Sequence, residues 1–160
     1  HEQINAEQYS DFLYLSMSAW FEDKGLSGFA NWMYVQYQEE LTHANKFFNY
    51  VNERSGKVEI KAIEQVPTEF ESVIDIVEKT LEHEQKVTGL INKLVDIAVE
   101  ERDHATQSFL QWFVDEQVEE EANVEELLDA LKLTKGEGNG LFMLDRELKQ
   151  RTFVDETAAE

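Results

Sequence analysis

The chain has 160 residues, of which 34 are acidic and 14 basic, so its formal net charge is -20, and it contains no cysteine. This charge argues against nucleic acid or an anionic membrane as a partner and favours cations. The lack of cysteine excludes disulfides, thiolate metal sites and cysteine nucleophiles, and it fits a reducing cytoplasm.

The length suits a single domain over residues 1–160, large enough to bury roughly 70% of the surface that the unfolded chain exposes. No apolar run reaches the ~18 to 20 residues of a membrane span, and no signal-peptide pattern opens the chain. We therefore expect a soluble, cytoplasmic protein. Because the helical pattern is present from His1 onward, we expect the sequence to begin inside its first helix.

An apolar periodicity of 3.6 residues runs through most of the chain, and only one proline and seven glycines interrupt it. This pattern predicts an almost entirely helical protein. Thr68 and Glu71 have the spacing of a capping box before the third helix, and Asp103 can cap the fourth. The glycine-rich run 136–140 precedes a short fifth helix. The expected helices cover residues 1–24, 27–55, 69–99, 103–135 and 141–151.

Short turns separate the first helix from the second and the third from the fourth, so each pair should form an antiparallel hairpin. The connection from Gly56 to Pro67 is longer than most helix-to-helix loops and predicts a crossover. Two hairpins joined by one long crossover form an all-α four-helix bundle of the type that binds metals in its core. The short fifth helix must dock on this bundle or on another subunit, because it is too short to be stable alone.

Each of the four long helices carries a carboxylate on the face that should be apolar. Glu84 interrupts the apolar seam of the third helix, and Glu120 interrupts that of the fourth. On the second helix, Glu40 and His43 lie one turn apart on the same side and form a Glu-x-x-His pair. Glu7 is the corresponding acid of the first helix, where the pattern is less regular.

These polar residues are predicted to lie at matching heights. Glu84 and Glu120 are both roughly 25 to 29 Å from the turn between their helices, and Glu7, Glu40 and His43 are about 20 to 27 Å from theirs. Two carboxylates ~4 Å apart repel by about 4 kcal/mol, and burying each ion costs several kcal/mol more. A buried pair of cations resolves this conflict. Oxygen ligands with a single imidazole favour iron or manganese.

Each feature taken alone has a simpler interpretation. A single glutamate in an apolar seam is most often a protonated or hydrogen-bonded core residue, and a Glu-x-x-His pair on a helix is common by chance. The acidic run 116–121 would ordinarily be read as a solvated face. The conjunction of four interrupted seams, matching heights and one histidine is what favours a metal centre.

The segments Asn5–Ser10, Gln38–His43 and Phe109–Glu121 resemble the non-haem bacterial ferritins. The closing segment Gly140–Leu148 resembles the short fifth helix of that family. The similarity covers almost the whole chain, and the combination of segments is specific to the family.

The resemblance implies a homo-oligomeric cage of 24 subunits. Each subunit would oxidise Fe(II) with dioxygen or hydrogen peroxide at its own di-iron centre, and the cavity would store the ferric mineral. One iron would be bound by Glu7, Glu40 and His43, and the second by Glu40, Glu84 and Glu120, with Glu40 bridging the two. The resemblance also implies roles for Gln117 near both irons, for Tyr14 as an electron donor, and for Glu39, Glu116 and Glu119, with Glu120, at a third and weaker iron site.

Leu41 and Asn123 distinguish the chain from the haem-containing bacterioferritins, which resemble it but carry a methionine and a second Glu-x-x-His pair at these places. No haem is therefore expected. Two other functions remain open at this stage. One is a di-iron or di-manganese oxidase or peroxidase that acts on another substrate, and the other is a non-catalytic acidic helical module.

Overall fold

The computed structural model describes residues 1–158, which form five α-helices, one short 3-10 helix and no strand. The long helices are α1 (Glu2–Asp23), α2 (Ser27–Glu53), α3 (Val73–Glu100) and α4 (His104–Leu133). They are followed by α5 (Gly138–Leu148) and by the 3-10 helix η1 (Glu156–Ala158). None of the helices in this part of the chain combines the length and the apolar character needed to cross a membrane.

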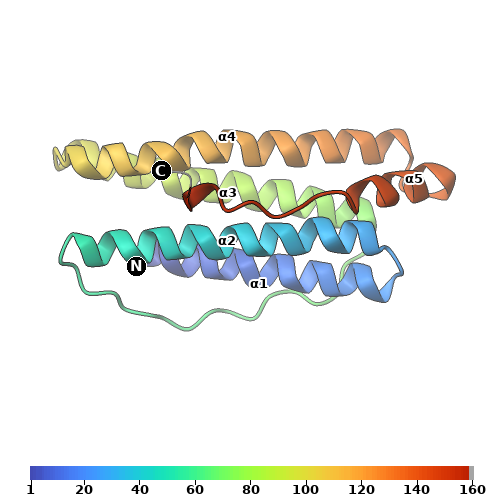
Figure 1. Ribbon diagram of the computed structural model, residues 1–160, viewed down its shortest axis with the longest axis horizontal. Helices are drawn as coiled ribbons and strands as arrows, with labels where there is room; N and C mark the ends of the chain where they lie inside the picture. The colour runs from blue at the N-terminus through green and yellow to red at the C-terminus, as the bar shows by residue number, and fades with distance from the viewer. Residues whose placement is uncertain (159–160) are drawn as a thin grey trace. The chain divides into compact units, whose positions relative to one another are not determined.

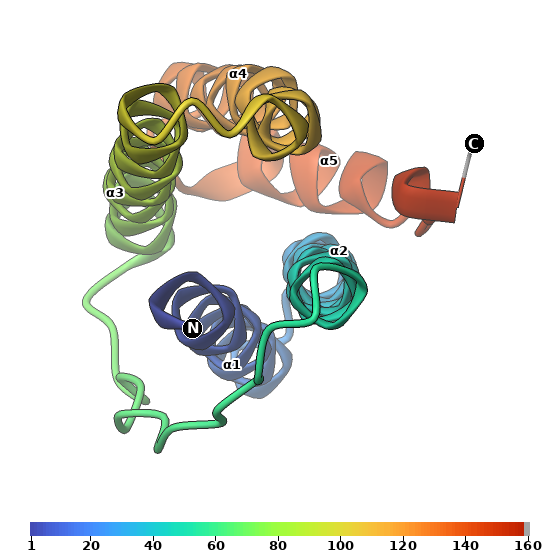
Figure 2. The ribbon, with the colours of Figure 1, turned by 90° about the vertical axis from the view of Figure 1, so that its left-hand side faces the viewer.

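The chain forms two compact units. The first contains residues 1–70 together with the residues from 138 onward, and the second contains residues 71–137. In the first unit, α1 and α2 lie side by side and run antiparallel (Figures 1 and 2). The rings of Phe21 and Phe29 stack across the turn between the two helices, with centroids 5.1 Å apart. The predicted hairpin of the first two helices is therefore present.

The turn after α1 needs a glycine. Gly25 has φ +75°, in the left-handed region, and Leu26 N donates a hydrogen bond of 2.9 Å to Phe21 O. Gly25 N donates to Glu22 O at 3.1 Å, which completes a Schellman motif. These bonds satisfy carbonyl groups at the end of α1 and turn the chain directly into α2.

The crossover covers residues 54–72, and its part in the first unit, residues 54–70, runs along the α1–α2 hairpin (Figure 1). Two side chains of α1 hold it in place: Asn5 Nδ2 donates to Ala62 O at 3.1 Å, and Ser16 Oγ donates to Pro67 O at 2.5 Å. The crossover has no secondary structure of its own, and α1 supplies hydrogen bonds to it at two widely separated points.

Within the first unit, the fifth helix docks against the start of α2. Asp145 is buried, and its Oδ1 accepts a hydrogen bond of 2.9 Å from the backbone N–H of Phe29, in the first turn of α2. The α5 helix starts and ends three residues earlier than predicted, because its first turn includes the glycines at 138 and 140. Phe142 and Met143, in contrast, remain exposed on this single chain.

In the second unit, α3 and α4 form an antiparallel hairpin (Figure 1). Asp103 caps α4 as predicted, since its carboxylate accepts hydrogen bonds from Thr106 N at 3.1 Å and from Thr106 Oγ1 at 2.6 Å. The capping box predicted at residues 68–71 is wrong. Ser72 caps α3 instead and accepts from Asp75 N at 3.0 Å, so this helix begins at Val73, four residues later than predicted.

Three of the long helices end on a residue other than glycine in the left-handed region. Ser55, Arg102 and Lys135 have φ values of 59°, 53° and 57° and follow the C-caps of α2, α3 and α4. Each of these ends carries the same pair of backbone hydrogen bonds as the end of α1. The hydrogen-bonded motif therefore fixes the backbone conformation even where the side chain disfavours it.

Candidate metal centre

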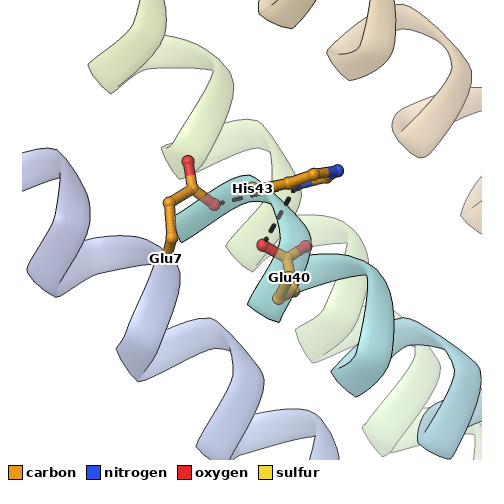
Figure 3. A group of neighbouring side chains, drawn as sticks. All are labelled: Glu7, Glu40 and His43. Carbon is orange, nitrogen blue, oxygen red and sulfur yellow. Dashed lines mark ion pairs between the residues drawn. The ribbon is translucent and has the colours of Figure 1, made fainter. Parts of the chain in front are cut away.

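Glu7, Glu40 and His43 all belong to the first unit, their side chains converge, and all three are buried (Figure 3). His43 Nδ1 lies 3.5 Å from Glu40 Oε2 and 3.9 Å from Glu7 Oε2. One ligand atom from each residue lies within 4.8 Å of the other two. Two carboxylate oxygens and one imidazole nitrogen suit iron, manganese or zinc, and the excess of oxygen favours the harder ions.

The two oxygens of the Glu7 carboxylate have different environments. Oε1 accepts a hydrogen bond of 2.6 Å from Gln3 Nε2, one turn earlier on α1, and this bond fixes the orientation of the carboxylate. Oε2 is buried and has no hydrogen-bond partner among residues 1–158. A buried acceptor without a donor costs free energy unless a cation occupies its lone pairs. This oxygen, which faces His43, therefore fits a metal ligand.

His43 has the protonation state that a metal ligand needs. Burial lowers the pKa of the His43 imidazole, and the negative charge of Glu7 opposes this effect only in part. The neutral imidazole keeps a lone pair on one nitrogen, and Nδ1 is the nitrogen that faces both carboxylates (Figure 3). At neutral pH the histidine can bind a cation without first releasing a proton.

Asp11 is a further buried carboxylate of α1, one helical turn beyond Glu7, and the sequence pattern assigned it no role. The residue is only 1% exposed, and Oδ1 has no hydrogen-bond partner within residues 1–158. Burial, and to a smaller extent the charge of Glu7, raises the pKa of Asp11 to about 7. The i, i+4 spacing from Glu7 was the available signal, because it places the two acids on one face of the helix.

The second unit holds Glu84 and Gln117 together. Gln117 Nε2 lies 3.2 Å from both Glu84 Oε2 and Glu84 O, and 3.1 Å from Thr88 Oγ1. The Thr88 hydroxyl is also 3.0 Å from Glu84 O and 2.8 Å from Glu121 Oε2. Glu84, Gln117 and Glu120 are buried. Sequence reasoning missed Thr88 and Glu121, because a threonine in a seam and a glutamate in an acidic run have no distinctive pattern.

The remaining predicted residues have mixed environments. Tyr14 is completely buried on α1, Glu116 is half-buried and Glu119 is exposed. Glu39 forms an ion pair of 2.9 Å with Arg151, which the sequence did not predict. Burial raises the pKa of Glu39, while the Arg151 guanidinium opposes the rise. That the ligands of the two units meet in one di-iron centre stays a prediction.

Comparison with known proteins matches the chain to one family. The family model of the ferritin-like domain covers residues 1–134. A bacterial non-heme ferritin of Bacteroides fragilis is 46% identical over 151 residues, which are 94% of each chain. A bacterial non-heme ferritin of Campylobacter jejuni is 42% identical over 93% of this chain and 89% of its own.

Solved structures give the same result. A ferritin of Archaeoglobus fulgidus, engineered to a closed form, has a TM-score of 0.94 and 49% identity over 96% of this chain and 93% of its own. The open-pore ferritin of the same archaeon has a TM-score of 0.93 and 49% identity over 94% and 92%. The predicted all-α four-helix bundle with a short fifth helix is thus confirmed. The chain belongs to the ferritin family.

Proposed function

We propose that this protein stores iron and that each subunit oxidises Fe(II) to Fe(III) at a di-iron centre before the ferric product enters the cavity of a 24-subunit cage. Glu7, Glu40 and His43 bind the first iron, Glu40 bridges to the second, and Glu84 and Glu120 complete the second site. The other proposed participants are Gln117 beside the two irons, Tyr14 as an electron donor, and Glu39, Glu116 and Glu119, with Glu120, at a third iron site.

The observation that carries this proposal is the burial of two carboxylates and a histidine around one point. His43 Nδ1 lies 3.5 Å from Glu40 Oε2 and 3.9 Å from Glu7 Oε2. Glu7 Oε2 lacks a hydrogen-bond donor among residues 1–158. Burying such charges without a cation would cost several kcal/mol per ion. A divalent cation removes the repulsion and occupies the open lone pairs, so iron is the substrate that this arrangement fits.

The chain's own residues account for the steps of oxidation. Each Fe(II) gives up one electron, so two bound ions supply the two electrons that reduce dioxygen to hydrogen peroxide or hydrogen peroxide to water. Gln3 fixes the Glu7 carboxylate, and neutral His43 offers Nδ1. The second site has only oxygen ligands and so binds iron less firmly, which helps the ferric product to leave.

The acidic character of the chain suits a protein that collects Fe(II). A net charge of -20 per subunit, multiplied over a cage, attracts divalent cations and raises their local concentration. Added salt should screen this attraction and slow iron uptake. The exposed apolar residues Phe142 and Met143 of α5 are further support for an oligomer, since they would otherwise face water.

The test is aerobic oxidation of added Fe(II) by the purified protein, followed by the near-ultraviolet absorbance of ferric iron, together with size exclusion of the metal-free protein. We expect fast oxidation in a large assembly, and loss of the fast phase in Glu40→Ala and His43→Ala. Glu22→Ala and His104→Ala, which change the same residue types at exposed positions, are the matched controls.

Oxidation no faster than in buffer would contradict the proposal and favour a non-catalytic module. Fast oxidation by a monomer or dimer would favour an oxidase that acts on another substrate. Measuring hydrogen peroxide release during the reaction identifies the oxidant, because dioxygen yields peroxide at this two-electron stage whereas peroxide itself is consumed.

A further inference from the structure

The residues that follow α5 run back along α2 (Figures 1 and 2). We call residues 149–156 the C-terminal segment. Asn31 Nδ2 fixes its start, because it donates to Leu148 O at 3.1 Å and to Arg151 O at 2.9 Å. The segment ends at η1, which contacts α2 again. It is therefore positioned by α2 at both ends.

The Arg151 side chain of this segment contacts three residues of α2. Its guanidinium carbon lies 4.5 Å from the centroid of the Trp32 ring, and Nη1 donates to Trp32 O at 3.1 Å. Nη2 donates to Gln36 Oε1 at 2.5 Å and to Glu39 Oε2 at 2.9 Å. These three residues occupy successive turns on one face of α2. The guanidinium of Arg151 lies against that face and bonds to all three of them.

The contact with Glu39 matters because Glu39 is directly next to Glu40 in the sequence and belongs to the proposed third iron site. The ion pair is partly open to solvent: the side chain of Arg151 is 21% exposed and that of Glu39 is 20% exposed. A cation arriving from solvent can therefore reach this carboxylate. It must, however, compete with a guanidinium for the same oxygen.

We propose that Arg151 is a positioning residue that acts as an exchangeable counter-ion for Glu39, so that the third iron site fills only when a metal ion displaces the guanidinium. The inference rests on the proposed function, since it takes Glu39 to be an iron ligand. A charge-assisted hydrogen bond holds the carboxylate while no metal is present. Displacement adds a step to metal binding at this site alone and leaves the Glu7, Glu40 and His43 site unaffected.

The rest of the C-terminal segment supports this exchange. Asp155 and Glu156 are exposed acids close enough to act electrostatically on His43, and Glu156 also acts on Glu39. The segment thus carries one cation that pairs with Glu39 and two anions further on, near the same part of α2. When a metal ion takes the place of Arg151, these acids help to balance its charge.

The experiment is anaerobic calorimetric titration of Fe(II) into the metal-free full-length protein, with Arg151→Gln and Arg151→Lys as variants. Arg151→Gln should tighten the weakest site about fivefold to tenfold, equivalent to about 1 to 1.4 kcal/mol, and leave the stronger sites unchanged. Arg151→Lys keeps the charge and should stay within about threefold of the parent. Arg54→Gln is the matched control, because Arg54 also bonds to an aromatic residue of α2, Tyr50, at 2.8 Å.

A double-mutant cycle shows whether Arg151 acts through Glu39. In the Glu39→Gln background the third site should be weak, and adding Arg151→Gln should then change no affinity. The inference would be overturned if Arg151→Gln alone bound the third iron no more tightly than the parent protein. It would also be overturned if Arg151→Gln raised the affinity equally in the parent and in the Glu39→Gln variant. Loss of iron binding in Glu40→Ala and His43→Ala, with no effect of Arg151→Gln, would overturn the inference while sparing the proposed function.

A second readout follows the segment itself. The chain has no cysteine, so Thr152→Cys, at an exposed position, accepts a single nitroxide label. Zn(II), a redox-inert divalent ion, should increase the mobility of the label as the third site fills, and it should do so in the Arg54→Gln control as well. Unchanged mobility on saturation with Zn(II) would show that Arg151 stays in place and would overturn the exchange.

Discussion

The backbone carbonyl oxygen of Asp145 would lie 1.6 Å from a Cβ atom added at Gly28, so α5 and the first turn of α2 are closer than any side chain at this position allows. The Asp145 carboxylate also accepts the hydrogen bond from Phe29 N. The N–H groups in the first turn of a helix have no partner within the helix. In α2 one of them is satisfied by a residue 116 positions further along the chain.

Gly28→Ala should therefore displace α5. The clash is with backbone atoms, which cannot rotate away, and overpacking of this kind destabilises by about 1 to 3 kcal/mol. Hydrogen exchange of the α5 amides should become faster, and the thermal midpoint should fall. Gly89→Ala is the control, since a Cβ there meets no atom within 4 Å and alanine should instead favour α3. Unchanged protection of α5 in Gly28→Ala would show that the close approach is not maintained in solution.

Asp11→Asn should stabilise the metal-free protein in a pH-dependent way. The pKa of Asp11 is about 7 in the folded chain against 3.8 for the free side chain, so the folded state resists ionisation. A raised carboxyl pKa destabilises the fold as pH rises from about 4 to about 7, with no further loss above that. The difference between a pKa of 3.8 and one of about 7 corresponds to at most roughly 4 kcal/mol of stability.

Thermal unfolding with a chelator present is the measurement. The gain from Asp11→Asn should be near zero at about pH 4, grow up to about pH 7 and then stay constant. Asp129→Asn, at an exposed position of α4, serves as the control and should show no such trend. If Asp11→Asn raised the thermal stability equally at every pH, removal of the Asp11 charge would not be the cause.

Gln3→Ala should weaken iron binding at the first site without abolishing it. The amide holds Glu7 Oε1 through a bond of 2.6 Å, and groups that orient a metal ligand typically contribute 10- to 100-fold in affinity. Anaerobic Fe(II) titration should thus show about a tenfold loss at the strongest site. Gln8→Ala, on the same helix, should leave the affinity unchanged, and a loss of equal size in both variants would argue for a general effect on α1.

Thr88→Val should weaken the second iron site selectively. Valine keeps the shape of threonine but removes the hydroxyl that links Gln117 to Glu121. Of the hydrogen bonds described above within residues 1–158, Gln117 then keeps those to Glu84. We expect a several-fold weaker second site and slower oxidation, with the first site intact. Thr80→Val makes the same change in α3, at a buried hydroxyl that donates to Ile76 O at 2.8 Å and has no contact with Gln117 or Glu121 among the hydrogen bonds described above, and it should have little effect on iron binding.

Much of the fold was predictable because helix periodicity and breakers are local signals. The buried positions on each helix were harder to predict than the helices themselves. The three-and-four spacing of apolar residues in the third helix predicts Leu81 and Val95 in its buried seam, but both are half-buried, whereas Ile76, Thr80 and Val87 are buried. A count of apolar residues cannot distinguish neighbouring positions of one helix face, and it passes over Thr80, a polar residue whose hydroxyl donates to Ile76 O inside its own helix.

At the candidate site, equal distance from the turn correctly predicted that Glu7 would meet His43. Asp11 was given no role, although the same count places it level with Glu40, since it lies 14 residues before Gly25 and Glu40 lies 13 after Ser27. The Arg151 contacts could not be predicted, because they depend on how α5 docks and on the path of the chain beyond it. Long-range placement of this kind leaves no periodic trace in the sequence.

The left-handed residues at Ser55, Arg102 and Lys135 have a consequence for engineering. L-residues with side chains pay roughly 1 kcal/mol or more for this conformation, which glycine adopts freely. All three lie outside the candidate metal centre, at the ends of helices whose hydrogen bonds already hold the turn. These three sites are thus where heat resistance could be added to the molecule while its metal chemistry is left alone.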